Sequence, residues 1–200
     1  YKKKNYKLLD TVNVNYNSPF HPEWYDLVKL HKTILENKII NVLEFGVGYS
    51  TIVMADALRI NEKKYKKYVN KNFRKNDPFK VYSVDSDKKY INLNFKKLKK
   101  LKLANYVSLS FSETYLGTFN NRICSYYNKI PNVLPDLIYL DAPGQFDVSG
   151  SMNGINFRSI ERMPISGDLL LMEYMLLPGC KIIVDGRKTN ARFLINNFQR

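Results

Sequence analysis

The chain has 200 residues, of which 44% are hydrophobic, and carries a formal net charge of +14. This length and apolar content predict a single domain with a substantial core. No run approaches the 18 or more apolar residues of a membrane span, so the sequence does not predict a membrane-spanning helix. The sequence shows no export segment either, so we expect a cytoplasmic protein.

Residues 1–38 are predicted to form an irregular arm followed by one helix. The arm is rich in Lys, Asn and Tyr and lacks periodicity. Pro22 then opens a pattern in which apolar residues recur every three or four positions as far as Leu35. That spacing places them on one face of a helix, which we expect to pack beside the first strand. The histidines His21 and His31 are expected to be structural.

The rest of the chain, residues 39–200, is predicted to alternate strands and helices. Apolar runs indicate strands at residues 39–45, 81–85, 106–110, 136–141 and 181–185. Helical patterns cover residues 50–59, the stretch from Ile91 to Leu101, residues 167–177 and the end of the chain. Apolar strands joined by helices require right-handed crossovers and a parallel sheet covered on both faces. The sequence therefore predicts a doubly wound α/β fold.

The positive charge is concentrated in residues 62–102. This segment contains 14 lysines and Arg74 against four acids, a net charge of +11. It includes a Lys-, Tyr- and Asn-rich stretch at about residues 61–80, which we expect to be a surface insertion. A basic patch of this kind is able to follow a phosphate backbone, which favours a nucleic-acid-binding module. The alternative is the residue bias of an AT-rich genome.

The most informative motif follows the first strand. An apolar run leads into Glu44, then Gly46 and Gly48, and then a helix start. Glycines there let the backbone approach a ligand, and Ser50 or Thr51 is placed to cap the helix. Thr51 stands where the dinucleotide pattern has its third glycine, and Glu44 would repel a diphosphate. A nicotinamide-dependent oxidoreductase is therefore the less favoured alternative.

A carboxylate at this point instead favours a ligand that carries an ammonium and a sulfonium, because opposite charges attract in a partly dry cleft. Other predicted strands also end in acids, at Asp85, Asp141 and Asp185. In open α/β sheets, ligands bind outside those strand ends. The bland alternative is that each acid only forms a turn or caps a helix. Arg187, two residues after Asp185, would suit an anionic acceptor.

Residues 44–50, Glu-Phe-Gly-Val-Gly-Tyr-Ser, resemble the first motif of the class I S-adenosylmethionine-dependent methyltransferases, E/D-x-G-x-G-x-G, with Ser50 replacing the third glycine. The resemblance covers about residues 39–198. It implies a Rossmann-like three-layer sandwich with S-adenosylmethionine as cofactor. The β-hairpin that usually ends this family's sheet is missing after the last predicted helix, so we expect a fragment of a longer protein.

The resemblance also implies roles for individual residues. The cofactor-binding residues would be Glu44, Gly46, Gly48, Tyr49, Ser50, Asp85, Ser86 and Glu113. Asp85 resembles the second motif, in which a carboxylate binds the ribose hydroxyls, and Ser86 would assist it. Glu113, or Ser112 before it, lies where the family contacts adenine.

Asp141, in Leu-Asp-Ala-Pro-Gly, resembles the fourth motif, which borders the transferred methyl group. We expect it to be the catalytic base. Asp141, Asp185 and Asn190 together form a possible Mg²⁺ site, as in some small-molecule O-methyltransferases. The expected acceptor is a small hydroxylated metabolite or sugar, held near His21, Pro22 and Trp24. An RNA methyltransferase that uses the basic segment 62–102 is the alternative.

Overall fold

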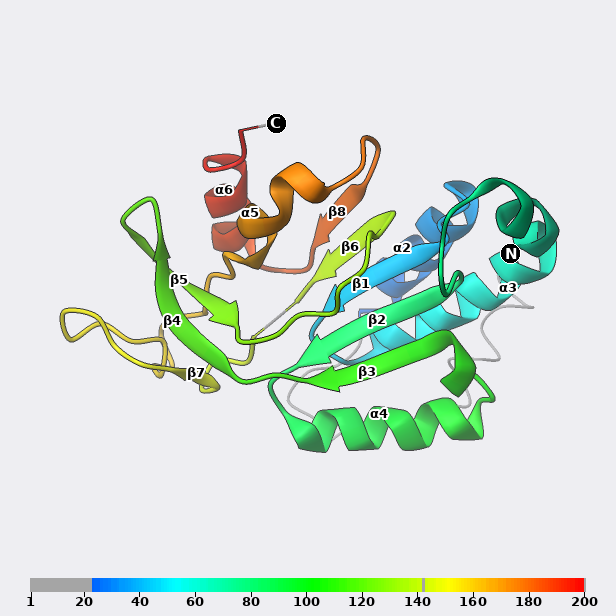
Figure 1. Cartoon of the computed structure of the whole chain (residues 1–200). Coiled ribbons are helices and arrows are strands. Elements are labelled where there is room, and N and C mark those ends of the chain that lie inside the picture. Colours follow the sequence, from blue (N-terminus) through cyan, green and yellow to red (C-terminus); the bar gives the residue numbers. More distant parts are fainter. Residues whose placement is uncertain (1–22, 142, 200) are drawn as a thin grey trace.

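The computed structural model describes residues 23–141 and 143–199. Within them, a central sheet has the strand order β3-β2-β1-β6-β8, and every neighbouring pair in it is parallel (Figure 1). Its strands are β1 (Asn41–Phe45), β2 (Lys80–Asp85), β3 (Val107–Phe111), β6 (Leu137–Leu140) and β8 (Lys181–Val184). The predicted α/β class, the five strands and their parallel arrangement are confirmed.

Helices cover both faces of this sheet. They are α2 (Trp24–Glu36), α3 (Tyr49–Asn72), α4 (Lys88–Lys100), α5 (Asp168–Met172) and α6 (Lys188–Ile195), with short 3₁₀ helices η1 (Ala104–Tyr106) and η2 (Glu173–Met175). Side chains alternate between faces along a strand. In β1, Val42 therefore packs with residues of α2, α3 and α4, whereas Leu43 packs with residues of α5 and α6.

The second helix is longer than the sequence pattern predicted. We expected it to end at about residue 59 and an insertion to follow, but α3 continues to Asn72. The Lys- and Tyr-rich stretch is thus largely the outer half of a helix, and only residues 73–79 form a loop. Lysine is a good helix former even where few apolar residues mark a buried face. Val69, which is buried, anchors this outer half to the core.

The helix predicted at residues 167–177 is shorter than expected. It consists of the five residues of α5, followed by η2. Leu169 and Leu170 are buried, but Leu171 and Met175 are 63% and 62% exposed. The apolar residues of this segment indicated a helix that is buried on all sides. In the structure, the side that carries Leu169 and Leu170 packs on the sheet, and the side that carries Leu171 and Met175 does not.

A second, three-stranded sheet was not predicted from the sequence. It has the order β5-β4-β7, with β4 (Thr114–Phe119) and β5 (Arg122–Tyr127) antiparallel and β7 (Val148–Ser149) parallel to β4. Asn120 and Asn121 join β4 to β5, and both have positive φ, as a tight two-residue hairpin loop requires. The hairpin projects beyond the ends of β2 and β3 (Figure 1).

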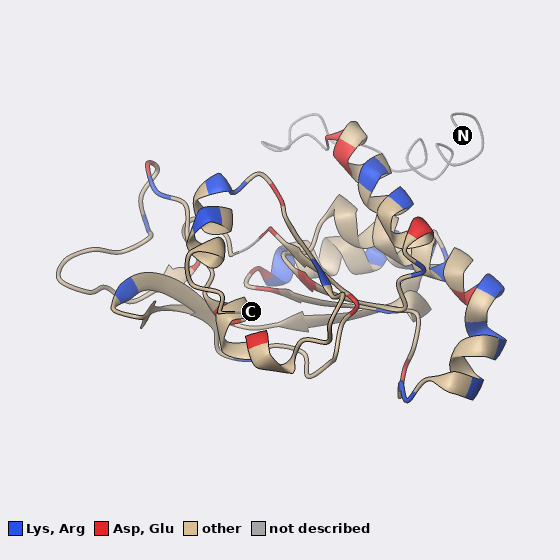
Figure 2. Cartoon of the chain, turned by 90° about the horizontal axis from the view of Figure 1, so that it is seen from above, with Lys and Arg blue, Asp and Glu red and all other residues tan. Residues whose placement is uncertain are grey.

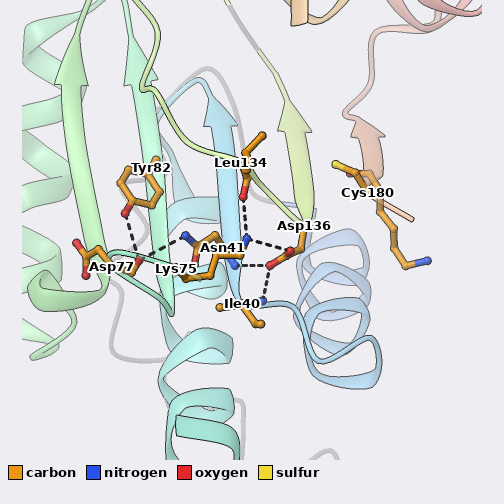
Figure 3. A network of polar contacts seen from close by, with 9 residues as sticks. Ile40, Asn41, Lys75, Asp77, Tyr82, Leu134, Asp136 and Cys180 are labelled. Atoms are coloured by element: carbon orange, nitrogen blue, oxygen red, sulfur yellow. Dashed lines mark hydrogen bonds and ion pairs between the residues drawn. The ribbon is translucent and has the colours of Figure 1, made fainter. Parts of the chain in front are cut away.

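The opposite, amino-terminal end of the central sheet is closed by a polar network (Figure 3). Asp136 Oδ2 accepts hydrogen bonds from the N–H groups of Ile40 and Asn41, at 3.0 and 2.8 Å. Lys75, in the loop after α3, donates to Leu134 O at 2.8 Å and lies 3.2 Å from Asp136 Oδ1. This network ties the long helix and its return loop to the start of β6.

Among the described residues, no helix is long and apolar enough to cross a membrane.

Candidate functional site

The turn between β1 and α3 is fastened to the end of β2. Gly46 has φ of +95°, a conformation that side-chain-bearing residues rarely adopt. Its N–H donates to Val84 O at 2.8 Å, and the Val47 N–H donates to Asp85 Oδ2 at 2.6 Å. The glycine motif and the acid of β2 therefore form one rigid unit.

Glu44 lies beneath this turn and is fully buried. Its carboxylate accepts hydrogen bonds from the hydroxyls of Ser50, Thr51 and Ser83, at 2.6, 2.7 and 2.6 Å. Burial raises its pKa to about 7, even though the three hydroxyls act in the opposite direction. The role of Glu44 in attracting a cationic ligand stays a prediction, because the hydrogen bonds of its carboxylate are all made within the chain. Its carboxylate holds the turn from below.

The start of α3 shows why Thr51 occupies the third glycine position of the dinucleotide pattern. Its hydroxyl accepts a hydrogen bond from the Gly48 N–H at 3.0 Å while it donates to Glu44. The N-cap of α3 is Gly48, not Ser50 or Thr51, and Thr51 contributes from the first turn by binding the Gly48 N–H. Ser50 is buried and donates to Glu44, so both hydroxyls serve the turn.

Asp85 is the acid of this unit that borders the turn. It is 9% exposed, and its second oxygen accepts from the Asp87 N–H at 2.7 Å. Burial raises its pKa, while the backbone donors Val47 and Asp87 oppose that change. A carboxylate has about four acceptor sites, so two such bonds leave capacity for ligand hydroxyls.

The other predicted cofactor residues surround this unit less closely. Ser86 donates to Asp147 Oδ2 at 2.7 Å, a partner that the sequence did not indicate. Glu113 is exposed in the link between β3 and β4. Tyr49 opens α3, and its ring lies 4.5 Å from Lys97 Nζ. Ser86 thus lies beside Asp85, and Glu113 lies on the exposed surface next to this site.

Asp141 lies next to the same turn, at the end of β6. β6 pairs with β1, and the Asp141 N–H donates to Phe45 O at 2.9 Å. Its side chain is half exposed and lies 3.6 Å from Nε of Arg187. Partial burial raises its pKa to about 6; the Arg187 guanidinium opposes this rise and Asp185 adds to it.

The three residues predicted to bind Mg²⁺ are engaged separately. Asn190 is buried, and its amide accepts from Ser166 N and donates to Ser166 O, at 2.8 and 3.1 Å. Asp185 accepts a hydrogen bond from the Tyr139 hydroxyl. In residues 23–141 and 143–199 no group of three His, Cys, Asp or Glu side chains is placed to hold a metal ion. Asn190 ties the start of α6 to the segment before α5, and the Mg²⁺ site at Asp141, Asp185 and Asn190 stays a prediction.

The hairpin adds site residues that the sequence reasoning missed. Tyr127, at the end of β5, packs its ring 5.8 Å from that of Phe45. Its N–H donates to Oδ1 of Asp168 at 3.0 Å, and Asp168 also accepts from the Ser166 hydroxyl. Burial raises the pKa of Asp168 to about 6. The Asn-Asn pair between two runs of aromatic and β-branched residues was the signal that could have revealed this hairpin.

The segment predicted to hold an acceptor is only partly described. Trp24 begins α2 and is 39% exposed, while His21 and Pro22 lie outside the described residues. On the same helix His31 is buried, and its Nε2 lies 3.2 Å from Oδ2 of Asp56, whose Oδ1 binds Arg59. The structural interpretation of His31 is therefore confirmed.

Many of the basic residues lie on the outer surfaces of helices, and others lie in strands and loops. Lys and Arg appear along the outer helices, whereas Asp and Glu also occur near the middle of the molecule (Figure 2). In the segment 62–102, the lysines belong mainly to the second half of α3 and to α4. At the strand ends Arg187 is the basic residue that lies beside Asp141.

No protein-family model matches the chain, and no curated protein matches it at a significant level.

Proposed function

We propose that the chain is a Rossmann-like, class I S-adenosylmethionine-dependent methyltransferase. One observation carries this proposal: the Gly46 turn is bound directly to the carboxylate of Asp85 through Val47. The turn also lies where the strand order reverses, because β1 separates β2 and β3 from β6 and β8. In open α/β sheets, ligands bind at such a switch point, outside the carboxyl ends of the strands.

In this proposal the turn, Asp85 and Asp141 have separate roles. The backbone of Gly46 to Gly48 approaches the methionine part of the cofactor, and Asp85 accepts hydrogen bonds from the ribose hydroxyls. Methyl transfer is an in-line displacement at a sulfonium carbon, so the protein mainly orients the two reactants. A hydroxyl acceptor also has to lose its proton. Asp141 is the proposed base, and a pKa of about 6 leaves it largely ionised at neutral pH.

The proposed acceptor is a small hydroxylated metabolite or a sugar. Asp141 supports this choice because its side chain is half exposed beside the turn. The neighbouring Arg187 guanidinium keeps this carboxylate ionised, and the raised pKa makes it a stronger base than an ordinary aspartate. Magnesium is not part of the proposal, because the Asn190 amide oxygen already accepts from Ser166 N and its nitrogen donates to Ser166 O.

Calorimetric titration with S-adenosylhomocysteine tests this function. We expect saturable binding to the wild-type protein and binding at least about 10-fold weaker in Asp85→Asn, which loses charge-assisted hydrogen bonds to the ribose. Asp77→Asn is the matched control, because Asp77 lies before β2 at the opposite end of the sheet. Absence of saturable heat with the wild-type protein would refute the proposal. Tight binding of NADH instead would favour the nicotinamide-dependent oxidoreductase.

A second candidate function is supported by the surface of α4. Tyr90 and Phe95 are 42% and 43% exposed on a helix that carries six lysines and no acid. Exposed rings among basic side chains are suited to bind single-stranded nucleic acid by stacking and charge. This arrangement would suit an RNA methyltransferase or a nucleic-acid-binding module.

Salt dependence separates this candidate from composition bias. If several lysines contact phosphates, the logarithm of affinity for a single-stranded RNA will fall steeply as the logarithm of salt rises. Phe95→Ala should then weaken binding, whereas Tyr25→Ala, on α2, should not. Weak retention that is equal in both variants would assign the lysines to composition alone.

A further inference from the structure

Three buried donor atoms near the strand ends lack a hydrogen-bond partner among the described residues. They are Nε and Nη1 of Arg187 and the hydroxyl of Tyr127. The Arg187 side chain is 11% exposed, and Tyr127 is 5% exposed. Buried polar groups are nearly always paired, since an unpaired one costs about 1–3 kcal/mol and a charged one costs more. These atoms therefore point to an interaction that the folded chain alone does not complete.

Both side chains border the end of β1. Arg187 precedes α6, and its Nη2 donates to Asp141 O at 2.9 Å. The Asp141 N–H in turn donates to Phe45 O, and the Phe45 ring packs against Tyr127. Burial raises the pKa of Tyr127 well above its usual value, and the carboxylates of Asp85 and Asp168 act in the same direction. One residue of β1 thus links the guanidinium and the phenol.

The neighbouring carboxylates do not accept hydrogen bonds from these three donor atoms. Asp168 accepts from the Tyr127 N–H and from Ser166, and Asp85 accepts from Val47 and Asp87. Asp141 is 3.6 Å from Nε, a distance too long for a hydrogen bond. A guanidinium has five N–H donors and no acceptor, and the Arg187 bond to Asp141 O uses only one of them. What is missing is therefore an acceptor, and preferably one with several oxygens.

We propose that Arg187 and Tyr127 form an oxyanion-binding subsite for a carboxylate or phosphate group of a bound ligand. The subsite rests on the proposed function only in the identity of that ligand, which is either the methyl acceptor or the amino-acid part of the cofactor. The planar guanidinium binds two oxygens of such a group through parallel N–H groups, and the phenol donates a further hydrogen bond. An anionic acceptor would in this way be held beside Asp141.

Titration with inorganic phosphate and, separately, acetate tests the subsite without any cofactor. The amide NMR signals of Asp141 and Gly186 report on it, because these residues flank the Arg187 contact. We expect saturable shifts with the wild-type protein. Arg187→Met should abolish them, whereas Arg192→Met removes an exposed arginine of the same helix and should leave them unchanged.

Tyr127→Phe distinguishes a binding role from a structural one. It removes only the unpaired hydroxyl, so we expect no loss of stability in urea and roughly 10-fold weaker phosphate binding. Unchanged binding in Tyr127→Phe would remove the phenol from the subsite. Absence of saturable shifts with both anions in the wild-type protein would overturn the proposal, and a buried water would then satisfy the donors.

The source of the oxyanion follows from two nucleoside ligands. If it is the carboxylate of the cofactor, Arg187→Met will weaken S-adenosylhomocysteine but not methylthioadenosine, which lacks the amino-acid part. If it belongs to the acceptor, both nucleosides will bind the variant normally while phosphate binding is lost. Phosphate binding without nucleoside binding would uphold the subsite and refute the methyltransferase, so the two proposals fail separately.

Discussion

The β1–α3 turn and the β6–β8 strand ends lie at the same edge of the sheet, but they are completed in different ways. In the turn, the hydroxyls of Ser50, Thr51 and Ser83 all bind Glu44. At the β6–β8 ends, Arg187 retains buried donors without a hydrogen bond among the described residues. The first region is thus organised before any ligand arrives, whereas the second provides donors that a ligand completes.

The helices next to the two regions also differ, in their length and in how deeply they are buried. α3 has 24 residues, and its first half is almost continuously buried from Ser50 to Leu58. α5 has five residues, and Leu171 within it is largely exposed. Most of the buried apolar contacts therefore lie with β1, β2 and the long helix. We expect stability to depend mainly on this half, which also contains the proposed cofactor turn, and recognition of the acceptor to involve the other half.

The largest expected effect is on stability, from Glu44→Ala. This change leaves three buried hydroxyls without their shared acceptor and opens a cavity beneath the turn. Large-to-small core substitutions and unpaired polar groups together predict a loss of about 4 kcal/mol in the free energy of unfolding. Urea unfolding followed by circular dichroism measures it.

Ser86→Ala is the control for this loss, because its hydroxyl binds Asp147 at the surface and is not part of the Glu44 network. We expect it to change stability by less than about 1 kcal/mol. A Glu44→Ala protein as stable as the control would show that the turn does not depend on its buried carboxylate. The contrast between the two regions would then disappear.

The sequence allowed the central sheet to be predicted but not the groups that complete the site. Apolar runs ending in acids placed Asp85 and Asp141 at one edge, because the strands are parallel and their ends coincide. The same pattern could not reveal that Glu44 points inward, because a buried acid and an exposed acid give the same sequence pattern at the end of an apolar run. Tyr127 reaches the site from a hairpin, through contacts distant in sequence that no local pattern encodes.

Protonation of Glu44 provides the next largest effect. Its pKa is about 7 in the folded protein, against 4.5 for an ordinary glutamate side chain. A raised carboxyl pKa means that its contribution to stability is complete below about pH 4.5 and is lost as the pH rises to about 7. The difference corresponds to about 3 kcal/mol.

Glu44→Gln removes this titration while it keeps the size and polarity of the side chain. We expect the unfolding free energy of the variant, relative to wild type, to rise between pH 4.5 and 7 and then to level off. Urea unfolding at several pH values measures this difference. A constant difference across that range would mean that Glu44 is ionised at all of these pH values and that the hydroxyls outweigh burial.

Substitution of Asp141 tests the β6–β8 side of the comparison through turnover. If Asp141 is the base, Asp141→Asn should lower kcat by about 10² or more, the usual contribution of a positioned base. Affinity for S-adenosylhomocysteine should stay nearly unchanged, since Asp85 and the turn bind the nucleoside in the proposed function. Because the acceptor is unknown, the measurement is a methyl-donor turnover screen across sugars, catechols, small acids and RNA. An Asn variant with wild-type turnover on an identified acceptor would exclude Asp141 from the mechanism.

The smallest expected effect lies at the other end of the sheet, in the Asp136 network. Asp136→Asn keeps an oxygen for the N–H groups of Ile40 and Asn41 but loses the ion pair with Lys75, which is largely buried. We expect a loss of about 1–2 kcal/mol in unfolding free energy, because a hydrogen bond to a charged group is worth about that much. Lys75→Met and the double variant complete a thermodynamic cycle, in which a coupling near zero would show that Lys75 contributes nothing through Asp136.

None of these variants should alter S-adenosylhomocysteine affinity, since ligands of open α/β sheets bind at the carboxyl ends of the strands and this network lies at the amino ends. A change in affinity would show that the return loop after α3 transmits strain along β1 to the Gly46 turn, so that stability and recognition are not divided between the two halves.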